Sequence, residues 1–283
     1  MTAAGTVAPS NTVGRGVTRA FETARAENRA VLVGYLPAGF PTVAGARDAI
    51  TAMVDGGVDV VEIGLPYSDP TMDGPVVARA AEIALANGTR TTDVLATVEA
   101  VAALGVPTLV MTYWNPIERY GVDRFAADLA GAGGAGLITP DLIPEEAGEW
   151  MAASDANGLD RVFLVAPSSP QARVVSTAAV TRGFLYAVSI MGVTGARTAT
   201  SSAAPELVAR ARAATDLPIG VGLGVSNGDQ AAEIGGFADA VIVGSAFVRA
   251  VLDAHDAAAA LRAARALAQD LSEGVRRRTG TGG

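Results

Sequence analysis

Two carboxylates, Glu62 and Asp73, are the side chains whose placement best suits acid–base chemistry. Glu62 lies inside the apolar run DVVEIGL at 59–65. Side chains alternate between the two faces of a strand, so Val61 and Ile63 point away from Glu62 and suit a helix-covered face. Glu62 is therefore expected to face the opposite, interior side, where burial would raise the pKa of its carboxyl group toward neutrality. Such a group could both donate and accept a proton at physiological pH.

Asp73 belongs to the loop PYSDPTMDGP at 66–75, which directly follows the strand carrying Glu62. An aspartate ahead of Gly-Pro is also ordinary turn chemistry, and the same interpretation applies to Asp69. Both interpretations stay open from local sequence alone. The position of Asp73 after a strand that carries an interior acid favours a chemical role.

Glycine-rich turns follow three late strand-like runs, and they are typical of a site for a phosphate group. Gly224 ends the segment GVGLG, the pair Gly244-Ser245 ends AVIVGSA, and a third turn spans 192–195. Backbone without a Cβ can approach an anion closely, and Ser245 adds a hydroxyl where a helix is expected to begin. Any one of these glycines could merely relieve crowding, but three consecutive turns favour a phosphate site.

The composition excludes several kinds of chemistry. All 21 basic residues are arginine, cysteine is absent and His255 is the one histidine, so a lysine imine, thiol catalysis and a nitrogen-ligated metal site are not expected. The formal net charge of −8 argues against a nucleic-acid surface. We find no run long enough to span a membrane and no signal peptide, so a cytoplasmic protein is expected.

Eight apolar runs, each followed by an alanine-rich stretch, predict the elements that position these groups. The runs are continuous rather than alternating, as in parallel strands covered on both faces. They lie at 31–36, 59–65, 107–113, 136–141, 161–167, 184–190, 218–224 and 240–246. The fold class predicted is a single (β/α)8 barrel, because eight strand–helix units in one chain of this length are typical of that fold. A doubly wound open sheet is the alternative.

The helices are expected between these runs, with one more ahead of the first strand. The expected ranges are 17–27, 43–56, 76–87, 92–104, 122–131, 144–157, 170–180, 202–214 and 255–272, with a short helix over FVRAVL after the eighth strand. The barrel is accordingly assigned to 17–272. Residues 1–16 are expected to be a disordered leader and 273–283 a disordered tail.

Four segments together resemble the α subunit of tryptophan synthase. They are VEIGLPYSDPTMDGP, SIMGVTGAR, GLGVS and VGSA, and the resemblance extends from about residue 17 to 272. It implies cleavage of indole-3-glycerol phosphate to indole and glyceraldehyde 3-phosphate. It also implies an α2β2 heterotetramer that makes L-tryptophan, no cofactor in this chain, and pyridoxal phosphate in the β partner.

The resemblance assigns roles to individual residues. Glu62 and Asp73 match the catalytic pair, and Asn115 lies where the family meets its β partner. The substrate and phosphate positions are matched by Tyr35, Tyr113, Tyr186, Thr194, Gly195, Gly224, Gly244 and Ser245. Phe40 and Ala78 depart from the commonest family pattern, which leaves open a specialised relative.

The expected reaction is a retro-aldol cleavage without a lysine imine or a metal. Protonation of the indole C3 makes the ring itself the electron sink. Glu62 is expected to move protons, and Asp73 to stabilise the positive charge that develops at the indole nitrogen. The alternatives are a stand-alone lyase with the same chemistry, another phosphate-binding barrel isomerase or lyase, and a non-enzymatic barrel, which intact Glu62 and Asp73 disfavour.

Overall fold

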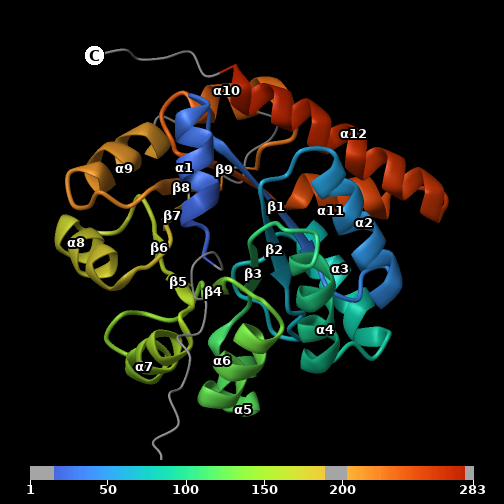
Figure 1. Cartoon of the computed structure of the whole chain (residues 1–283), viewed down its shortest axis with the longest axis horizontal. Helices are drawn as coiled ribbons and strands as arrows, with labels where there is room; N and C mark the ends of the chain where they lie inside the picture. The colour runs from blue at the N-terminus through green and yellow to red at the C-terminus, as the bar shows by residue number, and fades with distance from the viewer. Residues whose placement is uncertain (1–15, 189–202, 223, 278–283) are drawn as a thin grey trace, which may run out of the picture.

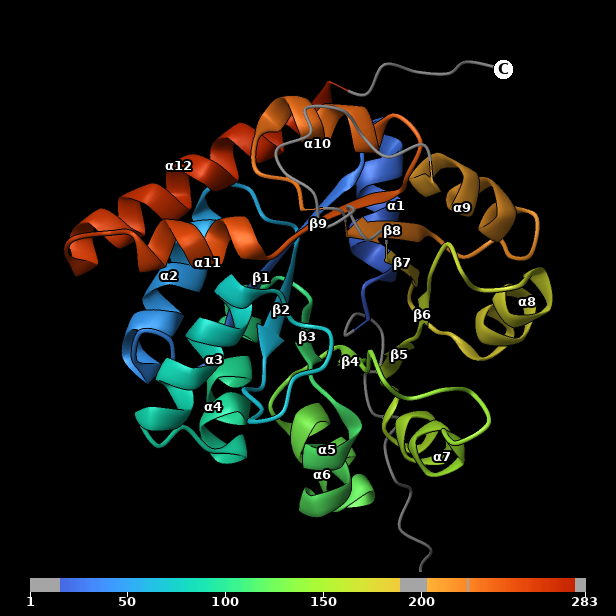
Figure 2. The same cartoon turned by 180° about the vertical axis from the view of Figure 1, so that it is seen from behind.

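The computed structural model of the chain describes residues 16–188, 203–222 and 224–277 (Figure 1). Its strands form one parallel sheet surrounded by helices (Figures 1 and 2). The strands are β1 (Val31–Pro37), β2 (Val60–Gly64), β3 (Thr108–Met111), β4 (Gly136–Ile138), β5 (Asp160–Val162), β6 (Leu164–Val165), β7 (Leu185–Val188), β8 (Ile219–Gly222) and β9 (Ala240–Val243).

The sheet closes on itself as a barrel. Its strand order is β5-β4-β3-β2-β1-β9-β8-β7-β6, and its two end strands, β5 and β6, are separated only by Phe163. The Phe163 carbonyl accepts a hydrogen bond from the Tyr186 N–H at 3.1 Å, so this residue still contacts β7. The single fifth strand expected at 161–167 is thus divided into β5 and β6. The predicted barrel is confirmed, and the open-sheet alternative is wrong.

The helices follow the predicted alternation with a few differences. They are α1 (Thr18–Ala26), α2 (Val43–Asp55), α3 (Pro75–Ala86), α4 (Thr91–Ala102), α5 (Trp114–Tyr120), α6 (Val122–Gly131), α7 (Gly148–Asn157), α8 (Gln171–Val180), α9 (Ala203–Arg212), α10 (Gly228–Gly235), α11 (Ser245–Leu252) and α12 (Ala257–Arg276). Helices α5 and α10 were not predicted from the sequence. Helix α7 begins later than predicted, because Pro144 begins a turn rather than the helix.

Helix α10 was missed because its start looks like a turn. Asn227 precedes Gly228-Asp229, a combination typical of loops. In the structure the Asn227 side chain caps the helix, accepting a hydrogen bond from the Gln230 N–H at 3.0 Å. The same residue types that favour turns also satisfy the free N–H groups of a first helical turn.

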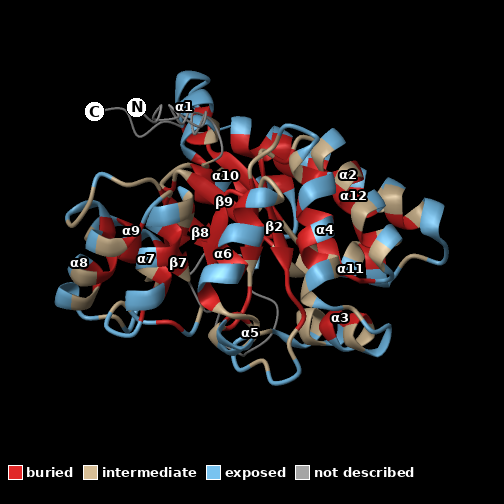
Figure 3. Cartoon of the chain, turned by 60° about the horizontal axis from the view of Figure 1, so that its bottom comes forward, coloured by how far each residue is buried: buried red, intermediate tan, exposed pale blue. Residues whose placement is uncertain are grey.

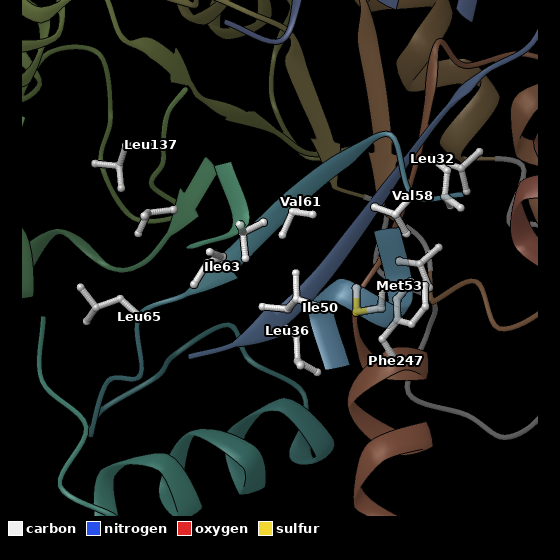
Figure 4. Close-up of a cluster of buried hydrophobic side chains, with 14 of the residues drawn as sticks. Leu32, Leu36, Ile50, Met53, Val58, Val61, Ile63, Leu65, Leu137 and Phe247 are labelled. Carbon is white, nitrogen blue, oxygen red and sulfur yellow. The ribbon is translucent and has the colours of Figure 1, made fainter. Parts of the chain in front are cut away.

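Two buried clusters lie on opposite sides of the sheet. The larger one fills the layer between strands and helices; Val61, Ile63 and Leu65 belong to it, and Figure 4 shows part of it. The smaller one occupies the barrel interior and includes Val60 and Leu109. The two faces expected for β2 are therefore confirmed. Figure 3 shows burial concentrated on the strands and on the helix faces that cover them.

Helix α1 closes the end of the barrel at which the strands begin. Phe21 and Ala24 belong to the interior cluster, and the rings of Phe21 and Phe184 lie 5.6 Å apart. The Val17 N–H donates a hydrogen bond of 2.9 Å to Asp160, at the start of β5. With α1 packed against the interior at this end, the carboxyl ends of the strands are the expected place for a site that reaches the barrel interior, as in other barrels of this kind.

The expected end of the barrel at 272 is wrong, since α12 continues to Arg276. Leu271 and Val275 are both fully buried, which anchors the last turn. Gly274 packs directly against α10, where the backbone of Gly228 occupies the place that a Cβ on Gly274 would take. The last turn of α12 therefore contributes to the core.

Replacing Gly274 with alanine should destabilise the barrel by about 1–3 kcal/mol, because α12 and α10 would have to move apart. The measurement is the urea unfolding midpoint of the full chain. Gly131→Ala is the matched control, since no atom lies within 4 Å of a Cβ built on that residue of α6. Equal midpoints for the two variants would contradict the close packing.

Candidate active site

A cavity of about 180 Å³ opens at the carboxyl ends of the strands. It brings together six residues that the sequence analysis singled out: Tyr35, Glu62, Asp73, Tyr113, Tyr186 and Gly244. Much of the remaining lining is apolar and had no chemical signal in the sequence; it includes Leu65, Met72, Val77, Met111 and Ile242. An apolar cavity with a few polar groups suits an aromatic substrate.

Glu62 is the buried acid of the cavity, with 1% of its surface exposed. It pairs in register with Tyr35 of β1 on one side and Leu109 of β3 on the other. Among the described residues its Oε1 atom has no hydrogen-bond partner. Burial without a compensating cation raises the pKa of Glu62 to about 8. Its carboxyl group is therefore mostly neutral at pH 7 and able to donate a proton.

Asp73 is the second acid, and it is half-buried in the loop between β2 and α3. The Tyr113 hydroxyl donates a hydrogen bond of 3.0 Å to Asp73 Oδ1, and the Met72 N–H donates one of 2.8 Å to the Tyr113 oxygen. Burial raises the pKa of Asp73, and the hydrogen bond from Tyr113 opposes that change. The two bonds fix the carboxylate at the cavity wall and favour its charged form.

A second hollow, which we call the glycine hollow, adjoins the cavity and shares five wall residues with it: Gly74, Val77, Tyr186, Ile242 and Gly244. Its wall includes Gly222, Gly224, Gly244, Ser245 and Arg249.

The turns in this wall suit an anion. Gly224 has a φ of +65°, a left-handed conformation that favours glycine. Gly244 and Ser245 form the start of α11, where free N–H groups and the helix dipole favour an anion. Thr194 and Gly195 lie outside the described residues.

Two tyrosines stand between the acids and the glycine hollow. Tyr186 packs over Gly222, where an added Cβ would come within 2.6 Å of the Tyr186 hydroxyl. Tyr35 lies between Gly64 and Gly244, and a Cβ on Gly244 would come within 3.3 Å of its ring. Burial raises the pKa of both phenols, so they stay protonated. Small residues on the neighbouring strands make room for both rings.

Asn115, the expected partner contact, is exposed on α5 at the rim of the cavity. Its side-chain amide donates a hydrogen bond of 3.1 Å to the Tyr67 hydroxyl. The Tyr67 ring lies 5.4 Å from the ring of Tyr113, which holds Asp73. A short chain of contacts therefore connects the rim to the second acid, a connection that the sequence did not indicate.

The two departures from the family pattern lie away from both acids. Phe40 is 1% exposed and is joined to Pro41 by a cis peptide bond, just before α2. Ala78 is partly buried on α3. Neither residue lines the cavity or the glycine hollow.

A closed parallel barrel with paired acids beside a glycine-lined anion hollow defines an enzyme of the phosphate-binding (β/α)8-barrel class. The profile of the family Tryptophan synthase alpha chain matches residues 21–276. The chain belongs to this family. The family reaction is a lyase cleavage of indole-3-glycerol phosphate, and the alpha subunit pairs with a beta subunit.

Individual relatives agree with this assignment. The tryptophan synthase alpha chain of Salinispora arenicola is 64% identical over 257 residues, which cover 91% of this chain and 96% of that protein. The one from Mycobacterium avium is 59% identical and covers 91% and 93%. The structure of Mycobacterium tuberculosis tryptophan synthase in space group F222 matches with a TM-score of 0.87 at 55% identity, covering 93% of this chain and 99% of that one.

Two features are absent from the ranges that the structure describes, 16–188, 203–222 and 224–277. No group of three or more histidine, cysteine, aspartate or glutamate side chains within those ranges could hold a metal ion. None of the helices in these ranges combines the length and the hydrophobicity that a membrane-spanning segment needs.

Proposed function

We propose that this chain cleaves indole-3-glycerol phosphate through Glu62 and Asp73, and that the phosphate group of the substrate occupies the glycine hollow. The observation that carries this proposal is the buried, unpartnered carboxyl of Glu62 in the same cavity as the hydrogen-bonded carboxylate of Asp73. Burial raises the pKa of both acids, but only Asp73 accepts a hydrogen bond that opposes the rise, so the two acids are suited to separate roles in one reaction.

Glu62 acts as the proton relay. Its neutral carboxyl donates a proton to C3 of the indole ring, which breaks the aromaticity and leaves a cationic indolenine. The resulting carboxylate takes the proton of the neighbouring glycerol hydroxyl, the C–C bond breaks, and its electrons return to the ring. Indole and an aldehyde leave, and Glu62 is neutral again, so the cycle needs no other proton carrier.

Asp73 stabilises the intermediate. Its carboxylate accepts a hydrogen bond from the indole N–H, where positive charge develops after protonation at C3. The Tyr113 hydroxyl and the Met72 N–H hold that carboxylate in place before the substrate arrives. Tyr35, Tyr113 and Tyr186 supply the walls of the cavity around the indole and glycerol portions.

The turns at Gly224, Gly244 and Ser245 hold the phosphate group, together with Gly195 from the part of the chain outside the described residues. Thr194, from the same part, contacts Asp73 when the site closes over the substrate. Asn115 contributes to the contact with the beta subunit. We assign pyridoxal phosphate to that partner and no cofactor to this chain, whose own side chains supply the proton steps. We place the complex in the cytoplasm.

The proposed function is tested by measuring indole release from indole-3-glycerol phosphate, with and without a cognate beta subunit. We expect slow release by the chain alone and strong stimulation by the partner, because loop closure over the substrate completes a catalytic site and a bound partner can stabilise the closed state. High activity without stimulation would instead identify a stand-alone lyase. Absence of indole in both arms would contradict the proposal.

A further inference from the structure

The glycine hollow contains one charged side chain, Arg249, in the part of the chain that the structure describes. The other wall residues are glycine, proline, valine, isoleucine, tyrosine and serine. Backbone N–H groups and a helix start supply only partial positive charges there. Arg249 is thus the sole full positive charge among the described wall residues of the place where the phosphate is proposed to bind.

The position of Arg249 on α11 directs it toward the anion site. Arg249 follows Ser245 by four residues, so the two lie on the same helix face, one turn apart. Side chains on a helix lean toward its N-terminus, which here is the turn formed by Gly244 and Ser245. The guanidinium group can therefore reach back along the helix toward a phosphate at that turn.

The guanidinium of Arg249 is also free to bind a ligand. It forms no hydrogen bond and no ion pair with the described residues, whereas arginines such as Arg29, Arg161 and Arg265 are paired with carboxylates. Arg249 is exposed at the rim of the hollow. Its position in the last turn of α11 is favourable for the helix dipole, but that interaction does not occupy its hydrogen-bond donors.

The negative net charge of the protein explains why a positive side chain is useful at the glycine hollow. The chain carries 29 acidic and 21 basic residues, and the carboxylate of Asp73 lines the adjoining cavity. A phosphate dianion that approaches the glycine hollow is repelled by these negative charges unless a local positive charge offsets them. An arginine fork is well suited to hydrogen-bond phosphate oxygens.

We propose that Arg249 is a specificity-determining residue that captures the phosphate dianion of the substrate and selects phosphorylated over unphosphorylated substrates. The proposal rests on the function proposed above and assigns a side chain to the anion site. Arg249 acts from the rim, beside the backbone groups of Gly244 and Ser245.

The first test measures binding of glycerol 3-phosphate to the full chain by calorimetry. Arg249→Gln should weaken binding about tenfold at low ionic strength, with a smaller difference at high salt, because the lost interaction is charge-assisted and partly screened. Arg249→Lys should restore most of the affinity. Arg262→Gln, which changes an exposed arginine in a separate groove between α2 and α12, should bind like the wild type.

The second test compares indole-3-glycerol phosphate with the unphosphorylated indole-3-glycerol. For Arg249→Gln, the preference for the phosphorylated substrate in kcat/KM should fall about tenfold, with KM for that substrate raised. Unchanged binding of glycerol 3-phosphate, or equal losses with both substrates, would overturn the proposal. If the variants bind as expected but the wild type releases no indole, the proposed function fails and the anion site stands.

Discussion

Replacing Glu62 with glutamine is expected to lower indole release about 1000-fold, since a positioned general acid or base contributes factors of this order and Glu62 serves as both. Glutamine keeps the size and shape of the side chain but can neither give up nor take a proton at neutral pH. The measurement is the turnover of indole-3-glycerol phosphate by the purified variant. Near-normal turnover by Glu62→Gln would contradict a role for Glu62 in the reaction.

The stability of the same variant is the control for folding. The pKa of Glu62 in the folded chain is about 8, above the ordinary value of 4.5, so the folded state holds this proton more tightly than the unfolded state. The free energy of unfolding of the wild type should therefore decline relative to that of Glu62→Gln as pH rises from about 5 to about 9. At the upper end of this range Glu62 is charged, and its charge is buried without a partner. A constant difference across that range would show that Glu62 is not held neutral.

Replacing Asp73 with asparagine is expected to lower indole release by about 100-fold to 1000-fold. Asparagine still accepts the hydrogen bond of the Tyr113 hydroxyl, so the loop geometry is preserved while the negative charge is lost. The loss falls on the step in which the indole nitrogen becomes positive, and electrostatic stabilisation of such developing charge commonly contributes more to catalysis than any other effect. The measurement is kcat for indole release, with substrate binding followed separately.

The matched control for this prediction is Asp69→Asn in the same loop. Asp69 is exposed, accepts a hydrogen bond of 2.6 Å from Ser68, and does not line the cavity. In the isolated chain this control should keep nearly wild-type turnover. If both variants lose activity equally, the loop itself matters and the charge of Asp73 has no special role.

The sequence was sufficient to predict the face of the strand on which Glu62 lies, but not the groups that set the pKa of Asp73. The alternation of Val60, Val61, Glu62 and Ile63 determines which face Glu62 occupies, because strand geometry is local. The bond between Tyr113 and Asp73 joins two loops far apart in sequence, and no local pattern reports such a contact. Family resemblance identified both residues, but it did not indicate the bond or its effect on pKa.

The barrel itself was predictable because strand and helix patterns repeat along the chain. The interruption of the fifth strand at Phe163 and the helix at Gly228–Gly235 were not, since tertiary pairing and a single Asn227 cap decide them. Arg249 was overlooked for a similar reason. An arginine in a helix normally faces solvent, and only the three-dimensional structure places it in the wall of the glycine hollow.

The pH dependence of kcat/KM for indole release by the wild-type chain tests the proton relay most directly. This parameter reports ionisation in the free enzyme, and the relay starts from the neutral carboxyl of Glu62. We expect kcat/KM to fall as pH rises through about 8, the pKa of Glu62. An increase through the same range would show that the reaction starts from the Glu62 carboxylate and would contradict the proposed relay.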